Sequence, residues 1–320
     1  MLKRVTTRLW NSPSTLLVLC GIFWGGNAIA SRLAVGQVTP LTLVFLRWVL
    51  VLAVLWPIYG SEVRAHWPEI RKKLPLIILM ASLGFTAFNV LFYVAGHYTT
   101  ALNIGILQGS MPAFVMAGAF LVHGTRITLV QFLGVLITTI GVLVVATRGN
   151  PSTILDIDFN FGDVLMLVAC GLYAAYTVAL RSRPVMPGAP FFSLLALIAA
   201  YTSVPLIAFE AVAWGLELPT LNGALLTIFV AIFPSCLAQI FLLRGVDLIG
   251  PGRAGVYMNL VPIFAAILAV AVLGEPFALY HGIALALVIS GILLAQRTPK
   301  PPKPIAASSR KTQARPQSNH

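Results

Sequence analysis

A few polar side chains and prolines interrupt long apolar stretches of the sequence, where they could bind a solute. Residues 101–122 contain no charged side chain, yet Gln108 and Pro112 lie near the centre of this stretch. A proline inside a helix removes one hydrogen bond and frees the carbonyl four residues earlier, here that of Gln108. In hydrocarbon such a carbonyl needs protein, water or a ligand as its partner. We expect the backbone at Pro112 to line a polar cavity; the alternative is a proline that only bends the packing.

Arg47 is the basic residue that lies well inside an apolar stretch. A charge within a membrane span indicates a function by default, and the planar guanidinium suits bidentate binding of a carboxylate. Arg47 follows Pro40 by seven residues, so it lies roughly 10 Å below the outer end of its helix. From there its side chain could snorkel back toward the surface. Two roles stay open: binding a substrate carboxylate, or pairing with backbone carbonyls to hold the helix in place.

The residue types that support catalysis or metal binding do not form a recognisable set. The five histidines are scattered, and the sequence has no phosphate-binding glycine loop, Ser-His-Asp set or HExxH motif. Cys20, Cys170 and Cys236 lack metal-ligand spacing. The nine acidic residues fall in loops or near the ends of apolar stretches, which argues against an intramembrane proton relay. We expect no enzyme, no metal and no cofactor, and transport by facilitated diffusion or exchange.

The elements that position these residues must be membrane helices. Hydrophobic residues make up 58% of the 320-residue chain and charged residues only 9%, whereas about 25% of a soluble protein is charged. Apolar stretches of eighteen residues or more recur along the chain, each long enough to span a bilayer. We expect ten spans at about 14–35, 40–60, 74–95, 101–122, 127–147, 160–181, 190–212, 220–243, 253–273 and 277–296.

The net charge of +12 could indicate a nucleic-acid partner, but the placement of the charges argues against one. With ten spans and the N-terminus inside, every Lys and Arg except Arg32, Arg47 and Arg148 falls on the inner side. This bias sets the orientation of membrane proteins. We therefore expect a multi-pass protein of the cell inner (plasma) membrane with both termini cytoplasmic. The basic tail at 297–320 is expected to be disordered and to lie near anionic lipid.

An internal repeat becomes visible when the sequence is shifted against itself by 150 residues. The matching pairs are Cys20 and Cys170, Pro40 and Pro190, Gly105 and Gly255, Pro112 and Pro262, Phe114 and Phe264, Gly124 and Gly274, and Gly141 and Gly291. The repeat predicts two five-helix copies at 14–147 and 160–296, after an N-terminal segment 1–13 and joined by a linker 148–159. An odd number of spans inverts the second copy, an arrangement typical of transporters whose site lies near the midplane.

The repeat also pairs the two prolines. By symmetry, Pro262 would free the carbonyl of Met258 as Pro112 frees that of Gln108. We expect the two breaks to line the substrate path and to act as hinges for alternating access.

Several of these features together resemble the EamA family of the drug/metabolite transporter superfamily, including its bacterial amino-acid exporters of the YddG type. They are the two five-helix copies, the "FLRW" segment at 45–48, a proline in each fourth helix and the "LGEP" segment at 273–276. The resemblance covers residues 14–296. It implies an all-α integral membrane fold with ten transmembrane helices as two inverted five-helix repeats, and a transporter of small organic metabolites. Because members move amino acids, other metabolites or drugs, the resemblance does not select a substrate.

The sequence departs from this pattern in one place. The "LGE" pattern occurs only in the second copy, and Thr125 stands where the repeat would put the counterpart of Glu275. Any role that needs this carboxylate in both halves is therefore in doubt.

The candidate cavity residues are polar or aromatic side chains inside the expected spans. They are Trp24, Asn27, Arg47, Asn103, Gln108, Tyr173, Tyr176, Tyr257 and Asn259, with Pro112 and Pro262 as hinges. Asn89 and Gln239 are equivalent positions that we expect to hydrogen-bond across helices rather than to contact substrate. We expect a second group, Gly134, Gly141, Gly282 and Gly291, to form packing contacts or a homodimer seam.

Efflux of an amino acid or related metabolite by alternating access is the leading functional prediction. The expected partners are a small-molecule substrate and membrane lipid. Import and the efflux of drugs or other lipophilic solutes stay open. A non-transporting membrane scaffold or receptor is the alternative from a different class.

Overall fold

The computed structural model describes residues 10–124, 127–150, 160–250, 254–255 and 257–295. The predicted tail 297–320, most of the linker 148–159, most of the segment 1–13, and Thr125 lie outside these ranges.

The described chain is helical, and none of it forms a β-strand. The first half contains α2 (Pro13–Leu33), α3 (Pro40–Ala65), α4 (Trp67–Lys72), α5 (Leu74–Ala81), η1 (Ser82–Ala87), α6 (Phe88–Tyr98), α7 (Ala101–Gln108), α8 (Met111–His123) and α9 (Leu129–Ala146). The second half contains α11 (Phe161–Ala179), η2 (Leu180–Ser182), α12 (Gly188–Ala213), α13 (Leu221–Val230), η3 (Ala231–Leu237), α14 (Ala238–Ile249), α16 (Leu260–Leu273) and α17 (Leu279–Ala295). The all-α prediction is confirmed.

Eight of the helical stretches are long and apolar enough to cross a membrane. The stretches are Pro13–Leu33, Pro40–Ala65, Leu74–Tyr98, Ala101–His123, Leu129–Ala146, Phe161–Ser182, Gly188–Ala213 and Leu221–Ile249. Within the described residues, the last two expected spans contain the shorter apolar helices Leu260–Leu273 and Leu279–Ala295; residues 254, 255 and 257, before the turn that precedes Leu260, are also helical.

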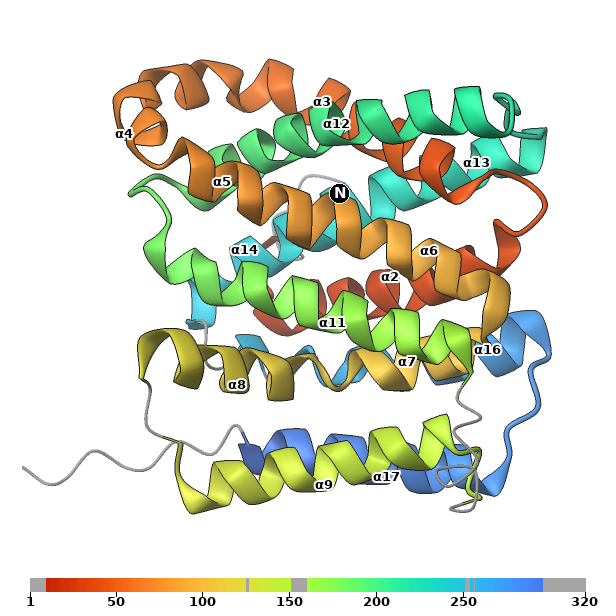
Figure 1. Ribbon diagram of the computed structural model, residues 1–320. Helices are drawn as coiled ribbons and strands as arrows, with labels where there is room; N and C mark the ends of the chain where they lie inside the picture. The colour runs from red at the N-terminus through yellow and green to blue at the C-terminus, as the bar shows by residue number, and fades with distance from the viewer. Residues whose placement is uncertain (1–9, 125–126, 151–159, 251–253, 256, 296–320) are drawn as a thin grey trace, which may run out of the picture.

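The helices lie roughly alongside one another (Figure 1). α3 packs along α12 at one side of the bundle, and α9 packs along α17 at the other. The colour gradient shows that α9 and α17 run in opposite directions, as do α2 and α11. The central layers, which contain α2, α6, α7 and α11, therefore lie between two helix pairs.

Glycines bring α9 and α17 into close contact. A Cβ atom added to Gly134 would lie 2.4 Å from the backbone nitrogen of Ala295, and one added to Gly291 would lie 2.4 Å from Oγ1 of Thr138. A Cβ on Gly141 would lie 3.0 Å from the carbonyl oxygen of Ala284. These three glycines therefore form packing contacts within one chain, which is one of the two roles expected for them from the sequence.

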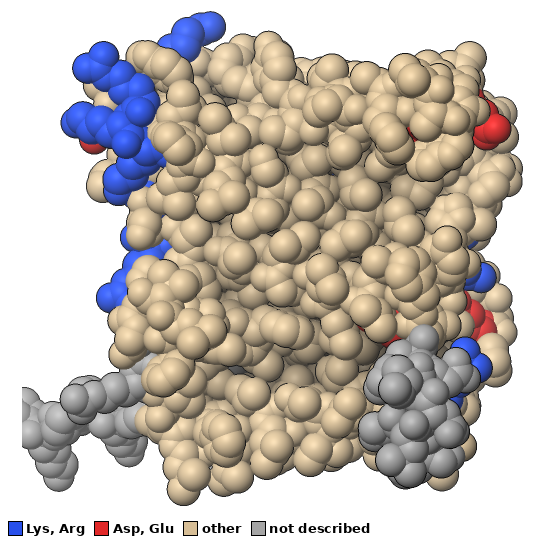
Figure 2. Space-filling model, viewed as in Figure 1, with Lys and Arg blue, Asp and Glu red and all other residues tan. Residues whose placement is uncertain are grey.

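The visible surface is almost free of charge between its two ends (Figure 2). Lys and Arg gather at the left edge, over the connection from α3 to α5, which carries Arg64, Arg71, Lys72 and Lys73. Large apolar side chains are exposed elsewhere; Leu121 is 79% exposed. Because water penalises such a surface and hydrocarbon does not, the bundle suits a lipid environment.

Two helices change to π-helical geometry at equivalent places in the two halves. η1 covers Ser82–Ala87 and η3 covers Ala231–Leu237, close to the 150-residue shift of the repeat. Single π-helical turns inside α-helices occur frequently at functional sites.

The predicted proline kinks differ in detail from the structure. α7 ends at Gln108, a turn at Gly109 and Ser110 follows, and Pro112 lies in the first turn of α8. Proline is well tolerated there, because that position has no intrahelical N–H bond to lose. The chain is therefore broken rather than bent at this point.

The second break has the same form. Pro262 lies in the first turn of α16, after a turn at Met258 and Asn259. The prediction of a free carbonyl at Met258 is wrong, because this carbonyl accepts a hydrogen bond from the Val261 N–H at 3.1 Å.

Candidate functional site

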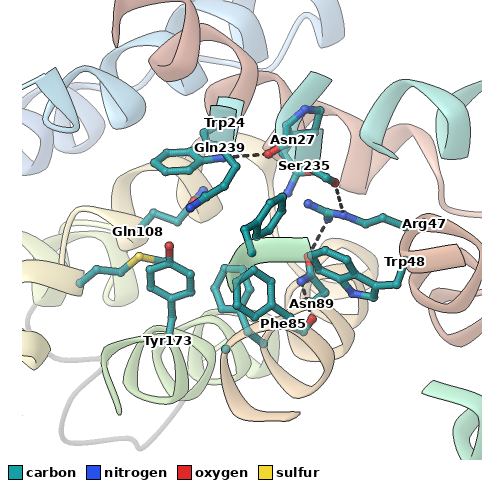
Figure 3. A pocket seen from close by; sticks show the side chains of 15 residues that line it. Trp24, Asn27, Arg47, Trp48, Phe85, Asn89, Gln108, Tyr173, Ser235 and Gln239 are labelled. Carbon is teal, nitrogen blue, oxygen red and sulfur yellow. Dashed lines mark hydrogen bonds between the residues drawn. The ribbon is translucent and has the colours of Figure 1, made fainter. Parts of the chain in front are cut away.

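A cavity lies at the middle of the bundle, lined by fifteen residues from both halves (Figure 3). They are Trp24, Asn27, Arg47, Trp48, Gly84, Phe85, Phe88, Asn89, Gln108, Met111, Tyr173, Phe192, Pro234, Ser235 and Gln239. Its volume is about 90 Å³. Since about 10–15 Å³ on this measure holds one water molecule, the cavity has room for several waters or a small solute.

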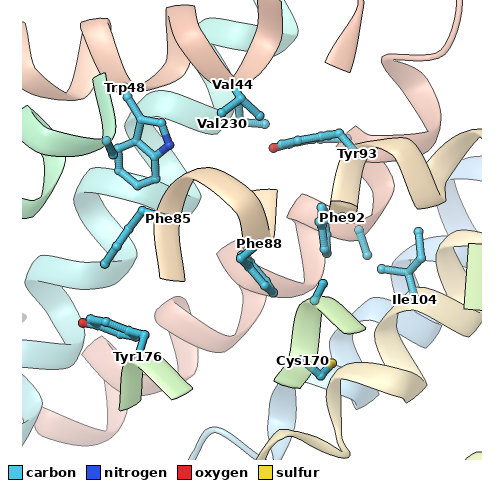
Figure 4. Packing of buried hydrophobic residues seen from close by; sticks show 14 of the residues in the cluster. Val44, Trp48, Phe85, Phe88, Phe92, Tyr93, Ile104, Cys170, Tyr176 and Val230 are labelled. Atoms are coloured by element: carbon cyan, nitrogen blue, oxygen red, sulfur yellow. The ribbon is translucent and has the colours of Figure 1, made fainter. Parts of the chain in front are cut away.

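The first π-helical turn shapes one wall of the cavity through a glycine. A Cβ atom at Gly84 would lie only 2.5 Å from Cγ of Tyr176, so this position allows the tyrosine ring to approach the backbone. The ring of Tyr176 then stacks edge-on against Phe85, with centroids 5.0 Å apart. Phe85 in turn contacts Trp48 at 5.2 Å. A chain of aromatic rings therefore backs the cavity (Figure 4).

The second π-helical turn supplies a polar group to the opposite wall. Pro234 has no N–H, so the carbonyl of Val230 loses its usual partner. Oγ of Ser235 donates to this carbonyl at 2.5 Å. The hydroxyl oxygen thus has a fixed position and can accept a hydrogen bond from the first half of the chain.

Arg47 is that donor. Its Nε donates to Oγ of Ser235 at 2.7 Å, and its Nη1 donates to Oδ1 of Asn89 at 2.6 Å and to the hydroxyl of Tyr93 at 2.9 Å. Tyr93 donates onward to Oδ1 of Asn27 at 2.7 Å. Arg47 therefore pairs with side chains and not with the backbone carbonyls that the sequence analysis considered. At 5% exposure it does not snorkel to a surface.

The guanidinium of Arg47 has no carboxylate partner among the described residues. The ion pair that the described chain does contain is Lys72 with Glu69 at 2.8 Å, in exposed α4. The aromatic ring of Trp48 lies 5.3 Å from Cζ of Arg47 and contributes a cation–π interaction. Neutral partners offset only part of the cost of burying a charge, so an incoming anion would find this site favourable.

Three hydrogen-bond donors on residues that line the cavity have no partner within the described chain. Arg47 uses Nε and Nη1 as above, which leaves Nη2 for a ligand. Nε1 of Trp48 and Nε2 of Gln108 are buried and unpaired. A buried donor without a partner costs about 1–3 kcal/mol. A ligand with acceptor oxygens would recover part of that cost.

The structure brings five of the nine predicted cavity residues together and separates the others. Trp24, Asn27, Arg47, Gln108 and Tyr173 line the cavity. Tyr176 lies directly behind its wall, against Gly84 and Tyr173. Tyr257, Asn259 and Asn103 are not among the lining residues.

These last residues have other surroundings. The hydroxyl of Tyr257 hydrogen-bonds that of Ser14 at 2.7 Å, near the start of α2. Asn259 is buried in the turn before α16. Nδ2 of Asn103 donates to Asp163, which also accepts from Thr99.

Two acidic residues near helix ends are more deeply buried than the sequence analysis implied. Asp163 and Glu210 are each 2% exposed. Oε1 of Glu210 accepts from Thr39 at 2.7 Å and from Thr42 at 2.8 Å, so it ties the end of α12 to the start of α3. Neither acid lines the cavity.

Glu275 of the "LGEP" segment binds the start of the broken helix. Its two carboxylate oxygens accept from the backbone N–H groups of Ala101 and Leu102, each at 2.9 Å. A carboxylate at this position satisfies unpaired amides and complements the helix dipole. The role is therefore to anchor α7, whose last residue, Gln108, reaches the cavity.

Sequence reasoning missed several lining residues, among them Trp48, Phe85, Phe192 and Ser235. Asn89 and Gln239 line the cavity too, although Asn89 also makes the predicted cross-helix hydrogen bond. The signal that could have found Ser235 is the Pro-Ser pair inside an apolar stretch. No group of three or more metal-ligating side chains occurs in the part of the chain that the structure describes.

Comparison with known proteins gives a consistent result. The sequence matches the family described as the EamA-like transporter family over residues 12–147 and again over residues 160–296. It is 28% identical over 298 residues to the uncharacterized transporter YyaM of Bacillus subtilis (strain 168), which covers 90% of this chain and 94% of YyaM. It is 24% identical over 296 residues to the uncharacterized inner membrane transporter YedA of Escherichia coli (strain K12), with 89% and 92% covered.

A solved crystal structure shares the fold. The likeness has a TM-score of 0.61 at 17% sequence identity, and it covers 89% of this chain and 96% of that chain.

Proposed function

Because the chain belongs to the EamA-like transporter family, we propose that it moves a small organic metabolite across the membrane through the central cavity. Efflux of an amino acid or a related metabolite is the leading form of this proposal. The observation that carries it is the buried guanidinium of Arg47, which has no carboxylate partner among the described residues and lies beside the aromatic walls of the cavity. Sites for small molecules combine such walls with a few well-placed polar groups.

The proposal includes alternating access between two inverted five-helix halves that together cross the membrane ten times. Three features support it: the opposite directions of α2 and α11 (Figure 1), the paired π-helical turns, and the paired breaks before Pro112 and Pro262. Broken helices beside a central site are typical of such transporters. In this mechanism the breaks serve as hinges, and the aromatic cavity opens first to one side and then to the other.

We also propose an orientation. The basic edge over the α3–α5 connection faces the cytoplasm of a cell inner membrane. Both chain termini lie on that side in this proposal, which agrees with α2 beginning and α17 ending toward the same edge in Figure 1.

Counterflow tests the proposal against a non-transporting scaffold or receptor. Purified protein is reconstituted into liposomes that are preloaded with an unlabelled amino acid or an analogous metabolite, without a pH gradient. Labelled solute outside should then accumulate transiently, and protein-free liposomes should show no accumulation. Absence of counterflow for every amino acid, carboxylic acid, amine, nucleoside and sugar tried would contradict the proposal and favour the scaffold.

A further inference from the structure

We infer that the cargo binds as a carboxylate at Arg47, and that the site makes no use of an ammonium group. This inference rests on the proposed transport function and narrows its substrate class. It predicts that carboxylic acids with a small aromatic or apolar body bind at least as well as the corresponding amino acids.

The charge of the cavity lining carries the first step. Arg47 is the charged residue among the fifteen that line the cavity, and the set contains no Asp, Glu, Lys or His. The acidic residue that contacts α3 is Glu210, which accepts a hydrogen bond from Thr42. Thr42 precedes Arg47 by five residues, or roughly 7.5 Å along a helix. A solute in the cavity therefore meets one positive charge and no negative charge on its walls.

The unpaired donors carry the second step. Nη2 of Arg47 is left without an acceptor, which a carboxylate provides and an ammonium does not. Nε1 of Trp48 and Nε2 of Gln108 are also unpaired, but both atoms are buried in the wall, so a carboxylate reaches them only when these side chains turn toward the cavity. Trp48 is itself only 1% exposed. A guanidinium–carboxylate hydrogen bond is charge-assisted and stronger than a neutral one.

The competing acceptors in the cavity are all neutral, and three of them already accept a hydrogen bond. Oδ1 of Asn89 accepts from Arg47, Oδ1 of Asn27 accepts from Tyr93, and the carbonyl of Pro234 accepts from Nε1 of Trp24 at 2.9 Å. An ammonium would have to compete for these oxygens beside the guanidinium, which repels it. A site built from buried donors discriminates strongly against an analogue that lacks the matching group.

The remaining walls of the cavity determine which group the solute can carry besides its carboxylate. Phe85, Phe88, Phe192 and Tyr173 surround the space with aromatic rings (Figure 3). These rings favour a flat apolar group, and the cavity volume of about 90 Å³ limits its size.

Four matched ligands separate the contributions of charge and shape. They are 3-phenylpropionate, phenylalanine, phenethylamine and 3-phenylpropionamide, which share a phenyl ring on a short chain. 3-Phenylpropionate carries only the carboxylate, and phenethylamine carries only the ammonium. Phenylalanine carries both charges, and 3-phenylpropionamide has a neutral amide in place of the carboxylate. Binding to the purified protein is followed by quenching of tryptophan fluorescence, since Trp24 and Trp48 line the cavity.

We expect 3-phenylpropionate to bind at least as tightly as phenylalanine, and at least tenfold more tightly than the amine or the amide. Arg47→Gln should remove this preference, and Trp48→Phe, which keeps an aromatic ring but loses the indole N–H, should weaken carboxylate binding several-fold. Arg71→Gln changes an exposed arginine of α4 and should behave as wild type. Because the ligand series is measured on the wild-type protein, the test does not depend on the folding of any variant.

The possible failures are distinguishable. Tighter binding of phenethylamine or of phenylalanine than of 3-phenylpropionate would overturn the inference while leaving a transporter in place. Transport of amines or neutral solutes, with no transport of carboxylates, would also overturn the inference. Binding and counterflow of none of the four, together with a blank in the broader solute panel, would contradict both the inference and the proposed function.

Discussion

Nε of Arg47 in α3 donates a 2.7 Å hydrogen bond to Oγ of Ser235 in the π-helical turn η3. This bond joins the first half of the chain to the second at the wall of the central cavity. Pro234 makes it possible, because the carbonyl that the proline leaves without a partner fixes the serine hydroxyl. The position of the guanidinium therefore depends on a local interruption in a helix of the opposite half.

The Ser235 hydroxyl should be needed for both stability and transport. Ser235→Ala removes the acceptor for Arg47 and the donor to Val230, and a buried group left unpaired costs about 1–3 kcal/mol. We expect a lower melting temperature in detergent and weaker solute binding. Ser290→Ala removes an exposed hydroxyl that donates to Leu287 and should leave both unchanged. Equal behaviour of the two variants would contradict this role.

The absence of a side chain at Gly84 should be essential to the cavity wall. Gly84→Ala introduces a Cβ 2.5 Å from Tyr176, and overpacking of this kind typically costs about 1–3 kcal/mol. Gly171→Ala is the matched control, because nothing lies within 4 Å of its added Cβ. We expect the first variant alone to lose thermal stability and solute binding. If Gly84→Ala binds solute as wild type does, the close approach of Tyr176 has no functional consequence.

Glu275 should stabilise the start of α7 through both carboxylate oxygens. Glu275→Ala removes the acceptors of two backbone N–H groups, and loss of a helix cap costs about 0.5–2 kcal/mol. Glu275→Gln keeps acceptor capacity and should cost less. Glu69→Ala, which breaks the exposed pair with Lys72, should have little effect because such pairs contribute little. Melting curves of the three variants test this expected order of stability. A Glu275→Ala protein as stable as wild type would contradict it.

The two helix breaks should matter more for transport than for folding. Pro112 and Pro262 lie in first turns of helices, where alanine is sterically acceptable, so Pro112→Ala and Pro262→Ala should be produced at normal levels. Without the prolines, the breaks are free to close into continuous helix. We expect slower counterflow with little change in solute affinity. Wild-type counterflow rates in both variants would contradict a hinge role.

Much of the architecture follows from the sequence because hydrophobic length and composition are strong signals. The apolar stretches correspond to helices, and Arg47 lies buried among polar partners as a charge within a membrane helix must. Trp24, Asn27 and Gln108, which the sequence singles out because polar and amphipathic side chains are scarce in such stretches, also line the cavity.

The lining of the cavity follows less directly from the sequence, for physical reasons. Asn103 precedes Gln108 by five residues, which displaces it roughly 7.5 Å along the helix, toward Asp163 and away from the cavity. The π-helical turns change which side of the helix each residue faces, so a regular period of 3.6 residues cannot predict that Phe85 and Ser235 line the same space. Phe192 looks like any other apolar residue until the tertiary packing places it at the wall.

Counterflow of labelled 3-phenylpropionate is the most direct test that the cavity around Arg47 is the transport site. Liposomes preloaded with the unlabelled acid, at equal internal and external pH, are compared for wild type, Arg47→Gln and Arg71→Gln, with each protein checked for a single symmetric peak on size exclusion. The predicted result is equal accumulation for wild type and Arg71→Gln, and at least a tenfold lower initial rate for Arg47→Gln. A well-folded Arg47→Gln protein that accumulates the acid at the wild-type rate would contradict the account.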